Sequence, residues 1–108
     1  MRDDDAATEA AVTRPALNPL FHEPARLALL SVLAPAEYAD FASLLRITGV
    51  SKSALSKHLS ALADAGVIEI GKSDTDRRGR RIALTAEGRV AFESYLDALG
   101  TIVQRARR

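Results

Sequence analysis

Residues 51–65, SKSALSKHLSALADA, decide the fold of this chain because they have the spacing of an amphipathic helix. Ser51 is a favoured N-cap residue, and leucines recur at positions 55, 59 and 62, on one face of such a helix. Small hydroxyl side chains and two lysines lie outside that face, and the only acid, Asp64, comes near the end. The exposed face is therefore expected to be small, hydroxylated and positively charged.

This kind of face suits a helix whose first half is pressed against a phosphate-lined groove. Short hydroxyl side chains let the backbone approach closely, lysines meet phosphates or guanine edges, and the helix N-terminus adds partial positive charge. The residues that the spacing places there are Lys52, Ser53, Ser56, Lys57 and Ser60. An ordinary surface helix has the same spacing, so the flanking sequence has to distinguish the two.

The preceding residues predict a second, shorter helix. Asp40 is a plausible cap for a helix over residues 41–47, and Thr48-Gly49-Val50 forms a tight connection to Ser51. Helix, glycine-containing turn and capped helix together have the form of a helix-turn-helix, although the same arrangement occurs in many all-α proteins. Further upstream, a helix over residues 24–34 is expected to begin at Pro24 and to turn Leu27, Leu30 and Leu33 inward.

The following residues predict a β-hairpin. Gly66 ends the helix, and strands are expected over 67–72 and 81–85, with Ile68, Ile70, Ile82 and Leu84 facing the core. Between them lies the hydrophilic tip SDTDRRGR, residues 73–80. A two-stranded hairpin directly after a helix-turn-helix is a wing.

Positive charge is densest in this wing, where four arginines occur within five residues: Arg77, Arg78, Arg80 and Arg81. Arginine at a hairpin tip can enter the minor groove, where negative potential is concentrated. The alternative is a solvated run of charges paired with Asp74 and Asp76. Its position after a candidate recognition helix favours DNA contact.

A final helix is expected over residues 86–107, capped by Thr85, with Gly100 as a possible bend. Its apolar residues follow a heptad spacing, and the apolar face that they form is too wide to be buried against so small a core alone. This favours a homodimer interface. The alternative is packing against the first helix of the same chain. The predicted interface consists of Leu17, Leu20, Phe21, Phe92, Tyr95, Leu96, Leu99, Ile102 and Val103.

Length and composition limit the remaining possibilities. The 108 residues have room for one domain, expected over 16–108 after a flexible arm at 1–15. Without cysteine there is no disulfide or thiolate metal site, and without a signal-peptide or membrane-spanning apolar run the expected location is the cytoplasm. Net charge is only +1, but residues 46–81 hold eight basic and four acidic residues, as expected of a nucleic-acid module.

Two stretches resemble known winged-helix regulators. LFHEPARLALLSVL and SALSKHLSALADAGVIEI are similar to the first and recognition helices of ArsR-type regulators. DRRGRRIALTAEG is similar to the wing and final-helix start of MarR-type regulators. The resemblance covers roughly residues 20–92 and implies a short, stand-alone winged-helix transcriptional regulator. The expected fold class is thus mainly α with a small β-hairpin (α+β), a winged helix-turn-helix with an added C-terminal dimerisation helix.

The resemblance also assigns roles to residues. On the recognition helix it implies DNA contacts from Ser53, Ser56, Lys57 and His58, so that the predicted contacts there are Ser51, Lys52, Ser53, Ser56, Lys57 and His58. In the wing it implies that Asp76 orients Arg78 toward the minor groove. The metal-binding Cys and His clusters of ArsR-type sensors are missing, so no metal and no cofactor are expected.

Neither histidine indicates catalysis or metal binding. His22 and His58 lie on different elements, whereas structural zinc takes about four protein ligands. His58 lies beside the leucine stripe, which favours a half-buried ring bonded to backbone or phosphate, and His22 is expected at a helix start. No phosphate loop, HExxH or GxSxG motif occurs, so an enzyme is not expected.

The predicted function is sequence-specific binding of double-stranded DNA by a homodimer, most simply as a transcriptional repressor. The alternative is a winged helix used as a protein-interaction or dimerisation module, since fold alone does not settle function. A small-molecule effector has no support in the sequence, and one would have to sit at the dimer interface near Phe21, Tyr95 and Leu99.

Overall fold

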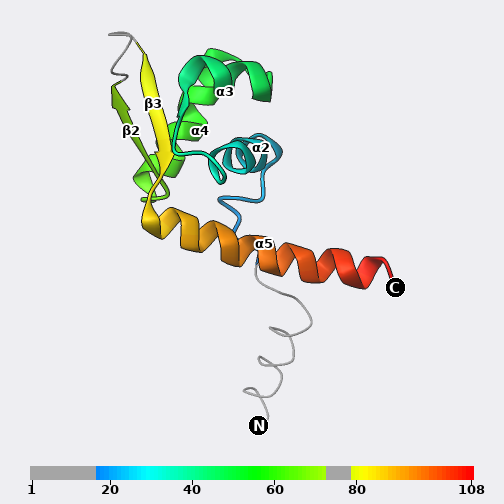
Figure 1. Ribbon diagram of the computed structural model, residues 1–108. Helices are drawn as coiled ribbons and strands as arrows, with labels where there is room; N and C mark the ends of the chain where they lie inside the picture. The colour runs from blue at the N-terminus through cyan, green and yellow to red at the C-terminus, as the bar shows by residue number, and fades with distance from the viewer. Residues whose placement is uncertain (1–16, 73–78) are drawn as a thin grey trace.

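The computed structural model describes residues 17–72 and 79–108, in which helices pack around one face of a small antiparallel sheet (Figure 1). The helix-rich α+β class with a β-hairpin is confirmed. The elements in chain order are α2 (Pro24–Leu33), β1 (Ala39–Asp40), α3 (Phe41–Thr48), α4 (Lys52–Asp64), β2 (Ile68–Lys72), β3 (Arg80–Leu84) and α5 (Ala86–Ala106).

Each helix begins at a side chain that accepts a hydrogen bond from the backbone of its first turn. Glu23 caps α2, Asp40 caps α3, Ser51 caps α4 and Thr85 caps α5. These bonds satisfy N–H groups that have no partner inside the helix. The caps expected at positions 40, 51 and 85 are confirmed, and the helices end within one residue of the expected positions.

The sheet has the strand order β1-β3-β2, with both pairs antiparallel. The hairpin was expected, and in the structure Ile70 pairs with Ile82. Strand β1 was not expected, because its two residues are too few to show an alternating pattern. Ile68 and Ile82 are buried as expected, whereas Ile70 is 39% exposed, against the expectation that it faces the core. β2 is an edge strand, and Ile70 lies farther from the base of the hairpin than the buried Ile68.

The core joins all four described helices to the base of the hairpin. Its largest side chains include an aromatic cluster in which Phe21 meets Phe92 and Tyr95 edge-on, with ring centroids 5.8 and 5.6 Å apart. All three residues are at most 2% exposed, so their assignment to a dimer interface is wrong for the surface of this chain. The segment before α2 lies against α5, and these rings fill the space between them.

The other residues predicted for the dimer interface divide into two groups. Leu17, Leu20 and Leu99 are partly buried against the same core. Leu96, Ile102 and Val103 are exposed, as is Val90. Of the predicted interface residues, those exposed to a second molecule are therefore Leu96, Ile102 and Val103.

Helix α5 runs without interruption through Gly100, and its last turns extend beyond the rest of the protein (Figure 1). Every residue from 100 to 108 is exposed. Within the described residues, no helix combines the length and the apolar character needed to cross a membrane. The predicted arm, residues 1–15, lies outside the described part of the chain.

The start of α5 is fixed to the end of α4 at the base of the hairpin. The Thr85 hydroxyl donates to the Gly66 carbonyl oxygen at 2.6 Å and accepts from the Gly88 N–H at 2.8 Å. A Cβ atom at Gly88 would lie 2.0 Å from the Val67 carbonyl oxygen, so only glycine allows the two backbones to come this close. The LTAEG stretch of the sequence thus has a packing role.

Candidate nucleic-acid interface

The first half of α4 presents the predicted polar face to solvent. Its leucines at 55, 59 and 62 are at most 3% exposed and hold the helix against the core. Opposite them the side chains are all exposed: Ser51, Lys52, Ser53, Ser56, Lys57 and Ser60. The helix therefore offers hydroxyls and two cations on a rigidly supported surface, and its sequence carries no acid before Asp64.

A hollow connects this face of α4 to the hairpin. It measures about 250 Å³ and is lined by Phe41, Lys52, Ser56 and Arg80. Arg80 is exposed at the first position of β3, so a cation from the wing faces a cation and a hydroxyl from the helix. Two cations and a hydroxyl around an open hollow form a suitable seat for a phosphate oxygen.

Arg81 does not join this group. Its guanidinium carbon lies 3.8 Å above the centre of the Tyr38 ring, and the residue is partly buried. Neighbouring residues of a strand point to opposite faces of the sheet, so Arg80 and Arg81 cannot serve the same surface. Arg81, which was predicted to contact DNA from the wing, thus lies on the Tyr38 side of the sheet.

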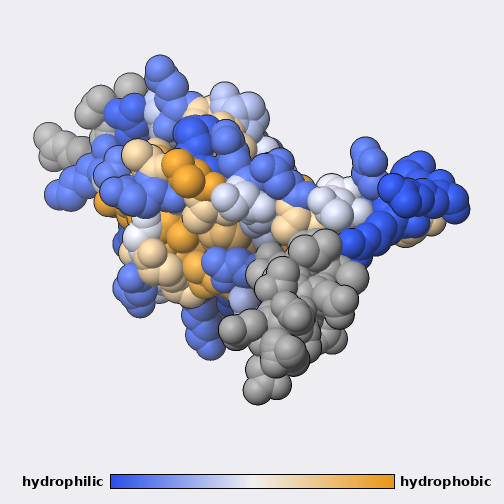
Figure 2. All heavy atoms as spheres, turned by 90° about the horizontal axis from the view of Figure 1, so that it is seen from below, coloured by the Kyte–Doolittle hydropathy of each residue, from blue (hydrophilic) through white to orange (hydrophobic). Residues whose placement is uncertain are grey.

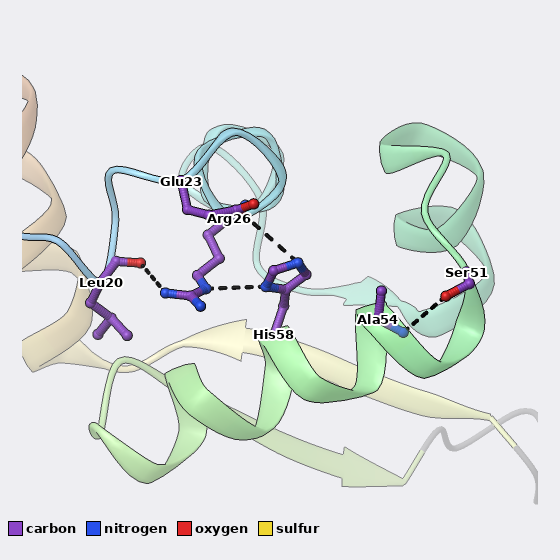
Figure 3. A network of polar contacts seen from close by, with 6 residues as sticks. All are labelled: Leu20, Glu23, Arg26, Ser51, Ala54 and His58. Carbon is purple, nitrogen blue, oxygen red and sulfur yellow. Dashed lines mark hydrogen bonds and ion pairs between the residues drawn. The ribbon is translucent and has the colours of Figure 1, made fainter.

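His58 also lies apart from the exposed face of α4. Its ring is only 17% exposed and points toward the start of α2, where Nδ1 accepts from Arg26 Nε at 3.1 Å (Figure 3). His58 Nε2 lies 4.0 Å from Glu23 Oε1. The expectation that the ring is half-buried is confirmed, and its bond partner in this chain is Arg26. A DNA contact from His58 stays a prediction.

The remaining predicted wing residues, Asp76, Arg77 and Arg78, lie outside the described residues. They stay predictions.

The two histidines have different partners in the structure. His22 Nδ1 lies 2.7 Å from the Tyr95 hydroxyl, whereas His58 accepts a hydrogen bond from Arg26.

Two capping carboxylates near this surface are stabilised in their charged form. The Arg26 backbone N–H donates to Glu23 Oε1 at 2.9 Å, which lowers the pKa of that carboxyl. The Ser43 backbone N–H donates to Asp40 at 2.7 Å and likewise lowers the pKa of Asp40. Both carboxylates are therefore engaged at helix starts, with their charge next to the N-terminal dipole.

Sequence reasoning missed Arg26, Tyr38 and Phe41. Phe41 directly follows the Asp40 cap, where the sequence gives no reason to distinguish it from the other apolar residues of α3. Arg26 is a single cation among the apolar residues of α2, which is the one sequence signal that sets it apart. None of the three belongs to a motif with a spacing that predicts its contacts.

The underside of the molecule carries a second kind of surface. Figure 2 shows apolar side chains gathered on the body on this side, with a hydrophilic projection beyond them. The exposed apolar side chains of α5 are those of Val90, Leu96, Ile102 and Val103. This surface differs chemically from the hydroxylated, basic face of α4.

Comparison with known proteins gives one family. The family described as a winged helix DNA-binding domain matches residues 25–103. The uncharacterized protein MJ0432 of Methanocaldococcus jannaschii is 32% identical over 78 residues, which cover 71% of this chain and 85% of that protein.

Solved structures have the same fold. A transcriptional regulator homologue from Pyrococcus horikoshii superposes with a TM-score of 0.75 at 18% identity, over 98% of each chain. The structure of reduced AbfR bound to DNA superposes with a TM-score of 0.68 at 17% identity, over 92% of this chain and 75% of that one. The expected winged-helix architecture is thus confirmed.

Proposed function

Because the chain belongs to the winged helix DNA-binding domain family, we propose that it is a homodimeric repressor that reads a specific double-stranded DNA sequence. In this proposal α4 enters the major groove and the wing contacts the adjacent backbone or minor groove. The repressor excludes polymerase from a promoter by occupying it.

The observation that carries the proposal is the surface formed by α4 and the start of β3. Lys52, Ser56 and Arg80 surround one hollow, and Lys57 extends the same charge along the helix. Phosphates position a protein on DNA, while short polar side chains on a recognition helix reach base edges. In AbfR, a protein of the same fold is bound to DNA, which supports this use of the surface.

The exposed apolar side chains of α5 support dimerisation. Leu96, Ile102 and Val103 lie near one another on the helix, next to the partly buried Leu99. A projecting helix end is only marginally stable by itself in water, so a second copy of α5 is the natural cover for these side chains. Dimers of this kind place two recognition helices about 34 Å apart, one turn of DNA.

Selection from a random pool of duplex DNA at moderate salt tests sequence-specific binding. We expect enrichment of an inverted repeat with half-sites one helical turn apart, and affinity that falls steeply with salt because counterions are released. Absence of enrichment together with absence of binding at low salt would contradict the proposal and favour a protein-interaction module.

Charge-matched variants locate the surface. Lys57→Ala and Arg80→Ala should each weaken binding about tenfold, as expected for one lost phosphate or base contact. Arg107→Ala, at the exposed end of α5, removes the same charge far from α4 and is the control. Equal losses in all three variants would mean that only net charge matters.

Dimerisation and repression need separate measurements. Sedimentation of Ile102→Glu should show monomers at concentrations where the wild type is dimeric, whereas Gln104→Glu, which lies nearly opposite Ile102 on α5, should not change the mass. Repression is tested by transcription in vitro from a template in which the selected sequence overlaps the promoter. Unchanged transcript at saturating protein would exclude a repressor.

A further inference from the structure

We propose that Arg26 is a positioning residue that fixes the recognition helix relative to α5, and so sets the half-site spacing that the dimer accepts. This inference rests on the proposed function, because it concerns how the two recognition helices are placed on DNA. Arg26 itself is not assigned a DNA contact.

Arg26 is a junction of three parts of the chain. Its Nε donates to His58 Nδ1 on α4 at 3.1 Å, and its Nη1 donates to the Leu20 carbonyl oxygen at 3.1 Å. Its backbone N–H donates to the Glu23 carboxylate at the start of α2. Figure 3 shows the guanidinium lying between Leu20 and the His58 ring, with both bonds formed by the same planar group.

The geometry defines the state of His58. Because Nδ1 accepts from Arg26, the hydrogen of the neutral ring lies on Nε2, which faces Glu23 Oε1 at 4.0 Å. The ring is thus held at Nδ1 by Arg26, while the 4.0 Å between Nε2 and Glu23 is too long for a hydrogen bond. Since His58 lies in the middle of α4, the Arg26 bond restrains the position of that helix relative to the start of α2.

The second Arg26 bond extends the restraint to α5. Leu20 is followed by Phe21, whose ring packs on Phe92, and by His22, whose Nδ1 lies 2.7 Å from the Tyr95 hydroxyl. Both partners belong to α5. The connection therefore runs from α4 through Arg26 to the segment before α2, and from there to the helix proposed as the dimer interface.

In a homodimer the tilt of α4 relative to α5 determines the separation of the two recognition helices. That separation has to match one turn of DNA, about 34 Å. A guanidinium can hold two acceptors in a fixed plane, which a lysine ammonium on a flexible stem cannot do. Loss of the two bonds made by the guanidinium should therefore broaden the range of half-site spacings that the dimer accepts, even where a positive charge is kept.

The test compares Arg26→Gln and Arg26→Lys with wild type on the selected operator and on operators with one base pair added or removed between half-sites. We expect both variants to lose about tenfold in operator affinity, the scale of one charge-assisted hydrogen bond, and to discriminate less among spacings. Binding to unrelated duplex DNA should stay unchanged. Arg107→Gln is the control, because Arg107 is exposed at the end of α5 and its replacement removes the same charge.

Variants of His58 test the same bond from the other side and keep the proposal testable if an Arg26 variant fails to fold. His58→Asn retains an acceptor near Nδ1 and should keep most of the spacing preference, whereas His58→Leu should lose it. Nitrogen NMR of the wild-type ring should show hydrogen on Nε2, a preference that Arg26→Gln abolishes.

Three outcomes would overturn the inference: an unchanged spacing preference in Arg26→Gln, full rescue by Arg26→Lys, or an equal loss in Arg107→Gln. Failure of the proposed function has a different signature, because the wild type itself then selects no operator.

Discussion

The two halves of α5 are held in different ways, although both carry the same apolar spacing. In the first half, Gly88, Phe92 and Tyr95 are buried, and the helix start is fixed to the end of α4 through Thr85. In the second half, every residue from position 100 onward is exposed. Apolar spacing therefore shows which side chains share a face, while the neighbouring segment decides which of them are covered within the chain.

The largest test of this difference compares Phe92→Ala with Leu96→Ala. Phe92 is 1% exposed, so its loss should cost about 3–5 kcal/mol, whereas Leu96 is 41% exposed and should cost well below that in the monomer. Denaturant unfolding at several protein concentrations measures both. If α5 forms the proposed dimer, the Leu96 effect should depend on protein concentration, and a concentration-independent cost of equal size would contradict the comparison.

The two glycines of α5 should respond to alanine with opposite signs. Gly88→Ala places a Cβ against the Val67 carbonyl oxygen and should cost about 1–3 kcal/mol or more through overpacking. Around Gly100 a Cβ meets nothing within 4 Å, so Gly100→Ala should stabilise the helix by up to about 1 kcal/mol. Thermal unfolding of both variants measures the difference, and shifts of the same sign would show that the halves are equally constrained.

Two threonines provide a smaller comparison. Thr85→Ala removes the cap of α5 and its bond to Gly66, and should cost about 1–2 kcal/mol. Thr101 donates only to the Asp97 carbonyl of its own helix, so Thr101→Ala should change stability by no more than about 0.5 kcal/mol. Thr85→Ser, which keeps the hydroxyl, is the control and should retain most of the stability in denaturant unfolding.

The smallest expected effect is that of acid on the caps of α2 and α3. Their caps, Glu23 and Asp40, have lowered pKa values in the folded chain, so their stabilisation is complete above the unfolded pKa of about 4. It is lost as pH falls through the lower folded values. Glu23→Gln and Asp40→Asn should therefore flatten the pH dependence of unfolding below pH ~4, whereas Thr85→Ser should leave it unchanged.

Local signals in the sequence predicted the helices and the hairpin well. Capping residues at 40, 51 and 85 and the glycines after two of the helices mark boundaries through interactions between near neighbours. Periodic leucines likewise identified the buried face of α4. These features depend on residues only a few positions apart, which is why a single sequence is enough to find them.

Features that depend on distant residues were not predictable in this way. β1 pairs with residues about forty positions away, and Phe21 meets Phe92 across most of the chain. The same limit applies to the candidate site: Lys52, Ser56 and Lys57 could be placed by helical period, but Arg26 on His58 and Tyr38 under Arg81 could not. The errors at Phe21, Phe92 and Tyr95 all arose from partners that lie far away in the sequence.

The bond between the Thr85 hydroxyl and the Gly66 carbonyl has a consequence for local unfolding. It closes the base of the hairpin, next to the backbone bond from Thr85 N–H to Val67 oxygen at 2.9 Å. Amides at this base should exchange hydrogen only when α4 and α5 separate, in the slowest, global opening, whereas those near Lys72 and Arg80 open locally. We therefore expect the strands to loosen at their outer end before the angle between the two helices changes.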